Sequence, residues 1–365
     1  MRQRSCETNP TRPTVPTVTA AQRAVTSCET DPTVLELTAA AALLLLISLS
    51  IVSCAPVIAP TKERPVEPTQ PPAAVFTSDL FATHWNDGRA EVNGYDLVVP
   101  RYGAFRRGVA VAVFVPEPFG NAARVKAEQA NHPLQDIFQV MKFNLIEDFP
   151  TGVYDYNVMT SVFVAMPGVN GLPTGSPTKI SFSAQEWVGQ TYEQLLFDKP
   201  GIRRSRHGYT DGEGDVRELL NYPAGGISED ALLLWARGMA QPFLAPGQSV
   251  TLPLLRSMKV VRMAHAPITW NNAEFSRGAR IEKVRVPAAE FDVEQYRVAT
   301  LDGRRTWHIF VEAAFPNRVV KWDVSDGTRA ELIGSERMAY WKMNGPGYED
   351  ALSKIGLSRR PPRTP

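Results

Sequence analysis

Apolar and polar residues alternate along most of the chain after residue 72, with the period of two that is typical of half-buried β-strands. In residues 154–166, the alternate positions are mostly apolar, which predicts a long strand with one buried face. Residues 109–115 (VAVAVFV) form a continuous apolar run, which predicts a strand covered on both faces. The pattern therefore predicts a mainly β globular domain over residues 73–365.

Two Asp-Gly pairs, Asp302-Gly303 and Asp326-Gly327, each separate two strand-like segments. Asp-Gly favours the positive φ values that a two-residue hairpin turn requires. We therefore expect residues 295–334 to form an antiparallel meander, with Trp307 and Ile309 on one face.

Helical content is predicted to be modest. Ser228 has a side chain suited to cap a helix over residues 229–237, which Gly238 would end. Residues 121–130 and 348–355 are weaker helix candidates. The predicted fold class is mainly β with a few helices. We expect the strands to form an antiparallel, curved sheet or half-barrel, or two such sheets.

The Gly- and Pro-rich segment of residues 167–177 is a candidate boundary between an N-terminal sheet and the rest of the β-rich domain. With 365 residues, of which 44% are apolar, the chain is long enough to bury a sizeable core. We therefore expect one large β domain or two ordinary ones.

The N-terminal region has the features of an export signal. Residues 39–52 are fourteen uncharged residues, too few to cross a bilayer as a helix but enough for the hydrophobic part of a signal peptide. The following Ile51-Val52-Ser53-Cys54 resembles the lipobox of bacterial lipoproteins, which implies diacylation of Cys54 and cleavage before it. The alternative is a buried apolar helix that happens to end in cysteine.

A Pro-rich stretch follows the cysteine and favours the lipoprotein interpretation. Residues 54–72 hold six prolines, which predicts an extended tether between a lipidated Cys54 and the globular domain. Two acyl chains hold a protein stably at a membrane. Ala55 stands where an inner-membrane retention signal usually has Asp, so the resemblance implies localisation to the cell envelope, at the outer membrane.

Residues 1–53 also contain features that do not belong to a signal peptide. The charges nearest the apolar run are acidic, and the sequence SCETNPT at residues 5–11 returns as SCETDPT at residues 27–33. We expect part of this region to be an extension created by a start codon assigned too early, and we exclude it from the fold.

Charge and cysteine content exclude several classes of function. The 39 basic and 38 acidic residues nearly cancel without a long run of either sign, so nucleic acid is not an expected partner. No cysteine follows Cys54, so the folded domain has no disulfide, thiolate metal site or cysteine nucleophile. We expect no cofactor and no metal site, since the histidines also lack metal-ligand spacing.

Gln185, Glu186 and Trp187 are the candidate binding residues. They end an alternating segment in which polar side chains share a face with the indole of Trp187, an arrangement suited to a pocket wall. If Glu186 were buried, it could serve as an acid or base. The alternative is a strand with one solvated face and a Trp at its rim.

The loop of residues 211–215 (DGEGD) places three carboxylates at alternate positions, where they could converge on a hard cation such as calcium. It lacks the spacing of an EF-hand and follows Arg203, Arg204, Arg206 and His207, so local ion pairs in a solvated loop are the favoured interpretation.

Residues 286–324 resemble the C-terminal part of an uncharacterised family of bacterial periplasmic and lipoprotein β-rich proteins. The resemblance rests on four features: Ala289-Glu290-Phe291-Asp292, Tyr296-Arg297-Val298, Trp307 and a strand ending near Asp323. Members resemble the half-barrel folds of lipoprotein carriers, in which a curved sheet surrounds an apolar interior. The match spans about forty residues of this longer chain.

Three hypotheses about function follow. The first is an envelope lipoprotein that binds a lipid or other apolar ligand, or assists envelope assembly, and it requires an apolar cavity. The second is an interaction or scaffold protein with a packed core and an exposed apolar patch. The third is an envelope hydrolase, which would need Glu186, Asp155 and His84 to converge in a cleft. An enzyme is the less favoured class, because no catalytic spacing is present.

Overall fold

The computed structural model describes residues 74–128 and 132–359. The predicted signal region, the lipidation residue Cys54 and the tether over residues 54–72 lie outside this part of the chain.

Fifteen strands of the described residues form a single sheet. They are β1 (Ala90–Arg101), β2 (Ala104–Gly120), β3 (Ile137–Pro150), β4 (Asp155–Ala165), β5 (Pro177–Glu186), β6 (Gly189–Phe197), β7 (Gly201–Gly208), β8 (Val216–Asn221), β9 (Ile227–Ser228), β10 (Ser249–Leu255), β11 (Trp270–Val286), β12 (Ala289–Thr300), β13 (Thr306–Glu312), β14 (Val319–Val324) and β15 (Arg329–Met338).

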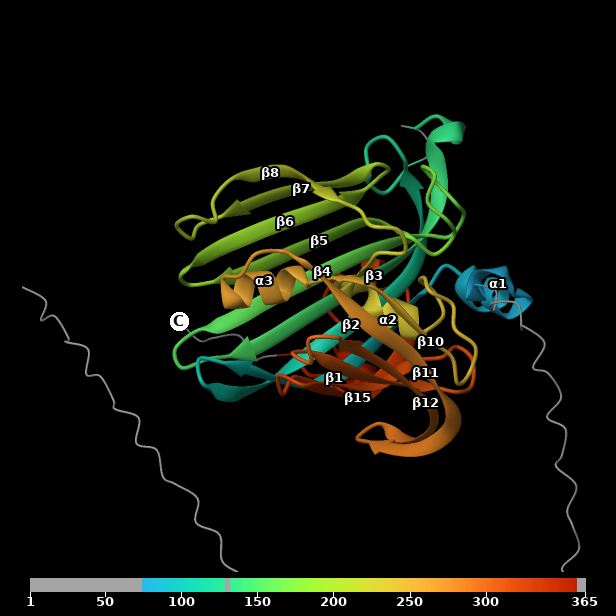
Figure 1. Cartoon of the computed structure of the whole chain (residues 1–365). Coiled ribbons are helices and arrows are strands. Elements are labelled where there is room, and N and C mark those ends of the chain that lie inside the picture. Colours follow the sequence, from blue (N-terminus) through green and yellow to red (C-terminus); the bar gives the residue numbers. More distant parts are fainter. Residues whose placement is uncertain (1–73, 129–131, 360–365) are drawn as a thin grey trace, which may run out of the picture. The chain divides into compact units, whose positions relative to one another are not determined.

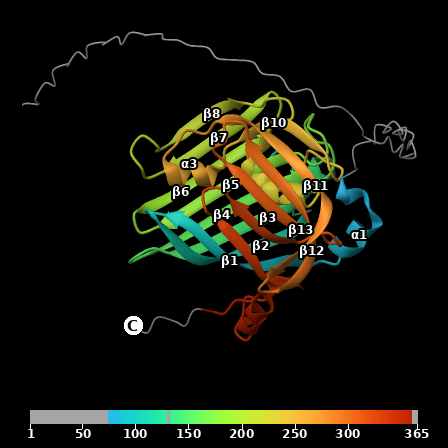
Figure 2. The same ribbon diagram turned by 60° about the horizontal axis from the view of Figure 1, so that its bottom comes forward.

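The sheet consists of two meanders joined in its middle. Its order is β8-β7-β6-β5-β4-β3-β2-β1-β15-β14-β13-β12-β11-β10-β9, so the first and last strands of the chain pair with each other. That junction runs antiparallel from Ala90 opposite Met338 to Val98 opposite Arg329. The remaining neighbouring strands also pair antiparallel, with the exception of β9 and β10, which pair parallel. Figures 1 and 2 show one large curved sheet that does not close, so the predicted mainly β fold is confirmed.

Short helices accompany the strands. They are η1 (Val75–Thr77), α1 (Asp79–Trp85), η3 (Leu134–Asp136), η4 (Glu229–Ala231), α2 (Leu232–Ala236), α3 (Met258–Ala264), η5 (Tyr340–Lys342) and η6 (Glu349–Ile355). Among the described residues, no helix is long and apolar enough to span a membrane.

The structure confirms most of the predicted elements. The helix predicted after Ser228 exists as η4 followed by α2, and Gly238 follows it with a positive φ of 70°. Both Asp-Gly pairs form hairpin turns, between β12 and β13 and between β14 and β15. The segment of residues 167–177 connects β4 to β5, which are hydrogen-bonded neighbours in the one sheet.

The prediction of a helix over residues 121–130 is wrong for the described part, where residues 121–123 form a turn and residues 124–128 a bend and an isolated bridge at Lys126. Arg124 adopts a positive φ of 54°, and its guanidinium donates to Asp198 and to the carbonyl of Thr178, 3.1 Å away. These contacts with distant segments favour a turn over a regular helix at this position.

The main core lies on the concave face of the sheet, around α2. All five residues of this helix are buried, including Trp235. At its C-terminal end, Arg237 donates to both carboxylate oxygens of Glu91 on β1, at 2.7 and 3.0 Å. Both side chains are at most 2% exposed, so a paired and fully desolvated ion pair fixes the end of α2 to the sheet.

A second, smaller cluster lies on the convex face, where η6 covers the sheet. Ile355 packs there with Val113 and Val115 of β2. Because Ala110 and Phe114 of the same strand face the main core, the prediction that residues 109–115 are covered on both faces is confirmed. A Cβ atom on Gly94 would lie 2.0 Å from the carbonyl oxygen of Ile355, so this close approach requires glycine.

Candidate functional site

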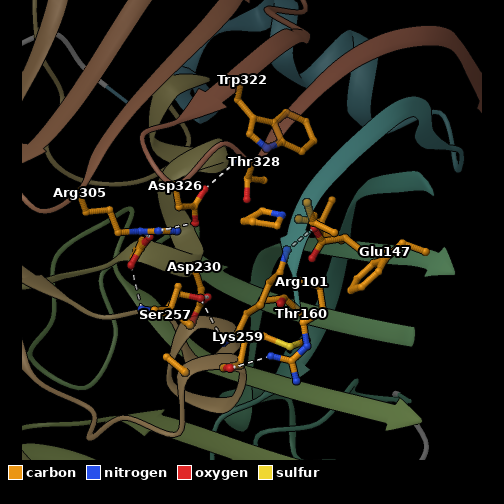
Figure 3. A pocket seen from close by; sticks show the side chains of 18 of the residues that line it. Arg101, Glu147, Thr160, Asp230, Ser257, Lys259, Arg305, Trp322, Asp326 and Thr328 are labelled. Carbon is orange, nitrogen blue, oxygen red and sulfur yellow. Dashed lines mark hydrogen bonds and ion pairs between the residues drawn. The ribbon is translucent and has the colours of Figure 1, made fainter. Parts of the chain in front are cut away.

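A cavity of about 460 Å³ lies between α3 and the concave face of the sheet, at the end where the β1–β2 and β14–β15 hairpins turn (Figure 3). Most of its wall is apolar, and the volume is within the range of small-molecule sites. The larger apolar side chains that line it are those of Val99, Phe105, Phe143, Leu145, Phe149, Leu233, Val260, Met263, Trp307 and Trp322.

The helix α3 forms one wall of this cavity and has defined ends. Ser257 is its N-cap, with a side-chain oxygen that accepts from the backbone N–H of Lys259 at 3.1 Å. The helix ends at His265, which has a left-handed φ of 48°. Met258 and Val261 are fully buried, so the helix is held against the molecule by its apolar side.

Two carboxylates of η4 bind the N-terminal end of α3. Ser257 donates its hydroxyl to Asp230 at 2.6 Å and its backbone N–H to Glu229 at 3.0 Å, and the backbone N–H of Met258 donates to Asp230 at 3.2 Å. Burial raises the pKa of Asp230 to about 7, although these hydrogen bonds act against the rise. Asp230 is therefore a cavity-lining carboxyl that titrates near neutral pH.

A group of charged side chains links η4 to the β12–β13 and β14–β15 hairpins. Glu229 accepts hydrogen bonds from the Arg305 guanidinium and from the indole N–H of Trp307, the latter at 2.8 Å. Arg305 also donates to Asp326 at 2.8 Å, as Figure 3 shows. These contacts satisfy the charges and leave the apolar surfaces of the cavity clear.

Lys259 of α3 reaches across the cavity wall to Glu147 of β3, with which it forms an ion pair (Figure 3). The side chain of Glu147 is 2% exposed, and its second oxygen, Oε2, has no hydrogen-bond partner among the described residues. Thr160 of β4 also lines this part of the wall. The apolar cavity therefore has a polar group at one side, as ligand sites commonly do.

Arg101 and Tyr102 line the edge of the cavity next to α3. The guanidinium of Arg101 donates to the Tyr156 hydroxyl at 2.8 Å and to the carbonyl of Met263, near the C-terminal end of α3, at 2.8 Å. The hydroxyls of Tyr102 and Tyr156 are 2.6 Å apart. Arg101 thus joins the β1–β2 hairpin to α3.

The candidate binding residues predicted from the sequence lie at the rim of the sheet, outside the lining of this cavity. Gln185, Glu186 and Trp187 surround a separate shallow depression of about 300 Å³ at the end of β5. Trp187 is 70% exposed. The Glu186 side chain is only 2% exposed and accepts from Arg262 of α3 at 2.9 Å, so it positions α3 from the side.

The three residues considered for a hydrolase do not form one site. Glu186 and Asp155 lie at the same end of the sheet, where β5 ends and β4 begins. His84 lies on α1, before β1 and hence at the opposite end, where its ring packs against Trp85 and Phe315 at 4.9 and 5.2 Å.

The acidic loop of residues 211–215 contains ion pairs. Glu213 accepts from Arg206 and is 2.8 Å from His265, and Asp215 is 2.8 Å from His207. Among residues 74–128 and 132–359, no group of three or more His, Cys, Asp or Glu side chains is arranged to hold a metal ion.

The cavity residues could not be named from the sequence, although one signal was present. Phe143, Leu145, Glu147 and Phe149 share one face of β3, so Glu147 interrupts an otherwise apolar stripe. A charged residue on an apolar strand face indicates a buried, paired group.

A second hollow, of about 520 Å³, lies at the opposite end of the sheet between the β4–β5, β6–β7 and post-β8 loops. Among the described residues, its lining contains no carboxylate and no histidine. Polar groups from several elements converge on the cavity next to α3, so we take that cavity as the candidate functional site.

The fold and cavity define a mainly β protein with an open, curved sheet and an interior site on its concave face. No protein-family model, curated protein or solved structure matches the chain.

Proposed function

We propose that this chain is an envelope lipoprotein whose β domain binds an apolar or amphiphilic ligand in the cavity next to α3. The observation that carries the proposal is the cavity itself, because it combines a mainly apolar wall with charged groups already paired at its sides. Charged groups that are paired need no ligand charge to neutralise them, so an apolar body is the preferred occupant.

The shape of the site favours ligand binding over the two other functions considered. A scaffold protein would have a filled interior, whereas this sheet encloses about 460 Å³ of space near α3. A hydrolase would need a nucleophile free to react beside an acid or base. The Ser257 hydroxyl donates to Asp230, but its oxygen also caps α3 by accepting from the Lys259 N–H, and the other carboxylates of the described wall are bound to arginine, lysine and backbone N–H groups.

Binding is tested with N-phenyl-1-naphthylamine, a neutral fluorophore that becomes brighter in apolar surroundings. The native protein should bind the fluorophore, and Leu145→Trp, which fills the cavity, should weaken binding by roughly tenfold. Asn157→Trp, at an exposed position of β4, is the control and should bind like the native protein. If the native protein leaves the fluorophore dark, or the two variants bind equally well while folded, the cavity is not a ligand site.

The lipoprotein part of the proposal is tested by intact-mass analysis of protein extracted from membranes. We expect a mature species that starts at Cys54 and carries added acyl mass, which Cys54→Ser should abolish. An unmodified chain that retains residues 1–53 would contradict the anchor while leaving the cavity experiment unaffected.

A further inference from the structure

Three hairpin turns at one end of the sheet carry apolar and aromatic residues where turns usually carry polar ones. They are residues 102–105 (YGAF), which form the turn after β1 and the first two residues of β2, residues 151–154 (TGVY) between β3 and β4, and residues 187–188 (WV) between β5 and β6. None of the three contains a charged residue. We call these segments the aromatic tips.

The meander places the aromatic tips side by side. Alternate turns of an antiparallel meander lie at the same end, so the first, third and fifth turns of this half of the sheet project together (Figure 1). The Tyr154 ring stacks on Trp187 with centroids 6.1 Å apart, and its hydroxyl donates to Tyr102 at 3.2 Å. The three turns therefore form one continuous surface.

This surface is strongly exposed. Its large side chains have exposed fractions of 55% for Tyr102, 68% for Phe105, 78% for Val153, 70% for Trp187 and 58% for Val188. Contiguous apolar groups at such exposure mark interaction sites, because water disfavours them and turn sequences are usually polar. The next turn on the same side, between β7 and β8, carries the acidic residues 211–215 and ends the apolar surface.

We propose that the aromatic tips insert into the interface of a lipid bilayer, so that the cavity opens toward the membrane. Tyrosine and tryptophan suit this location, because their rings enter the apolar layer while the hydroxyl and indole N–H remain at headgroup level. Phe105 and Val153 would enter deeper, and Arg107, exposed on β2 behind the first tip, would meet lipid phosphates.

The position of the cavity is the independent argument for a bilayer. Tyr102 and Phe105 belong both to the aromatic tips and to the cavity lining. An apolar ligand can therefore pass between the membrane and the cavity without exposure to water, which would otherwise cost free energy in proportion to its apolar area. This inference goes beyond the proposed ligand binding, since the tips can insert into a bilayer without a ligand in the cavity, and the cavity can bind a ligand without membrane insertion.

The absence of cysteine after Cys54 allows a site-specific test on the full chain. With Cys6, Cys28 and Cys54 changed to serine, a nitrobenzoxadiazole label is attached at Val153→Cys. The control label is placed at Leu134→Cys, in the β2–β3 connection at the opposite end of the sheet. Both native side chains are 78% exposed, so the two labels start in equivalent solvent.

Vesicles of phosphatidylcholine with a minor share of phosphatidylglycerol should shift the emission of the Val153 label to shorter wavelength and leave the Leu134 label unchanged. Val188→Asp, added to the Val153-labelled protein, should raise the lipid concentration at half-maximal response by roughly tenfold. This comparison holds even if the N-terminal apolar residues bring the chain to the vesicle, because both labelled proteins contain them.

Equal responses of the two labels, or no response of the Val153 label, would overturn the proposal. A shift of the Val153 label that depends on protein concentration without vesicles would assign the aromatic tips to a second copy of the chain and would also overturn it. Binding of N-phenyl-1-naphthylamine is measured on the same samples, so failure of membrane insertion is distinguished from failure of ligand binding.

Discussion

Asp230 joins η4 to the N-terminus of α3, and it should make the stability of the domain depend on pH. Burial raises its pKa from the ordinary 3.8 to about 7 in the folded protein, and unfolding returns the ordinary value. The perturbation is Asp230→Asn, which keeps one acceptor for the Ser257 hydroxyl and cannot ionise.

The direction of this pH dependence follows from the proton that Asp230 binds in the folded state. Between about pH 4 and pH 7 the folded state holds a proton on Asp230 that the unfolded chain releases, so the free energy of unfolding falls as the pH rises. A rise in pKa of about three units corresponds to a loss of at most about 4 kcal/mol, complete above pH 7. Asp230→Asn removes this contribution, so relative to the native protein the variant should gain stability with increasing pH.

Urea unfolding followed by tryptophan fluorescence, at several pH values from about 4.5 to about 8, measures this difference. Asp326→Asn is the control. For Asp326, burial acts to raise the pKa, but the attraction and hydrogen bond of Arg305 lower it overall. The stabilising contribution of the Asp326 carboxylate is therefore lost only in more acidic solution. The free energy of unfolding of Asp326→Asn should differ from that of the native protein by a constant amount over the same pH range. If the free energy of unfolding of Asp230→Asn differs from that of the native protein by the same amount at every pH, the reasoning is refuted.

Two further substitutions test the contacts that hold the fold together. Gly94→Ala should lower the free energy of unfolding by roughly 1–3 kcal/mol in urea titrations, because its methyl group would collide with η6. The methyl group of Gly152→Ala would enter open space, so the free energy of unfolding of this control should lie within about 0.5 kcal/mol of the native value. Glu91→Gln should cost roughly 3–5 kcal/mol by leaving Arg237 buried without a counter-charge. The double change Glu91→Gln/Arg237→Met should cost less, and an equal cost would mean that the ion pair does not cause the loss.

Local patterns in the sequence were sufficient to predict several of the strands. The period-two alternation of residues 154–166 corresponds to β4, and the two Asp-Gly pairs correspond to hairpin turns. These features are local, because alternation reports which face of a strand is buried and a turn depends on the φ values of adjacent residues.

The short helices α1 and α3 were not predicted from the sequence. Each has seven residues, about two turns, and such a length gives little periodic signal and little intrinsic stability. Residues 229 and 230 were predicted only as the start of a helix, whereas in the structure the carboxylates of Glu229 and Asp230 hold the N-terminus of α3.

The sequence by itself determined the mainly β class, several of the strands with their buried faces, the two Asp-Gly turns and the absence of cysteine from the described domain. Only the tertiary structure decided that β1 pairs with β15, that α3 lies over the concave face and that a cavity remains between them. The physical reason is separation along the chain. Lys259 and Glu147 are 112 residues apart, and their contact depends on how the whole sheet curves rather than on the residues beside either one.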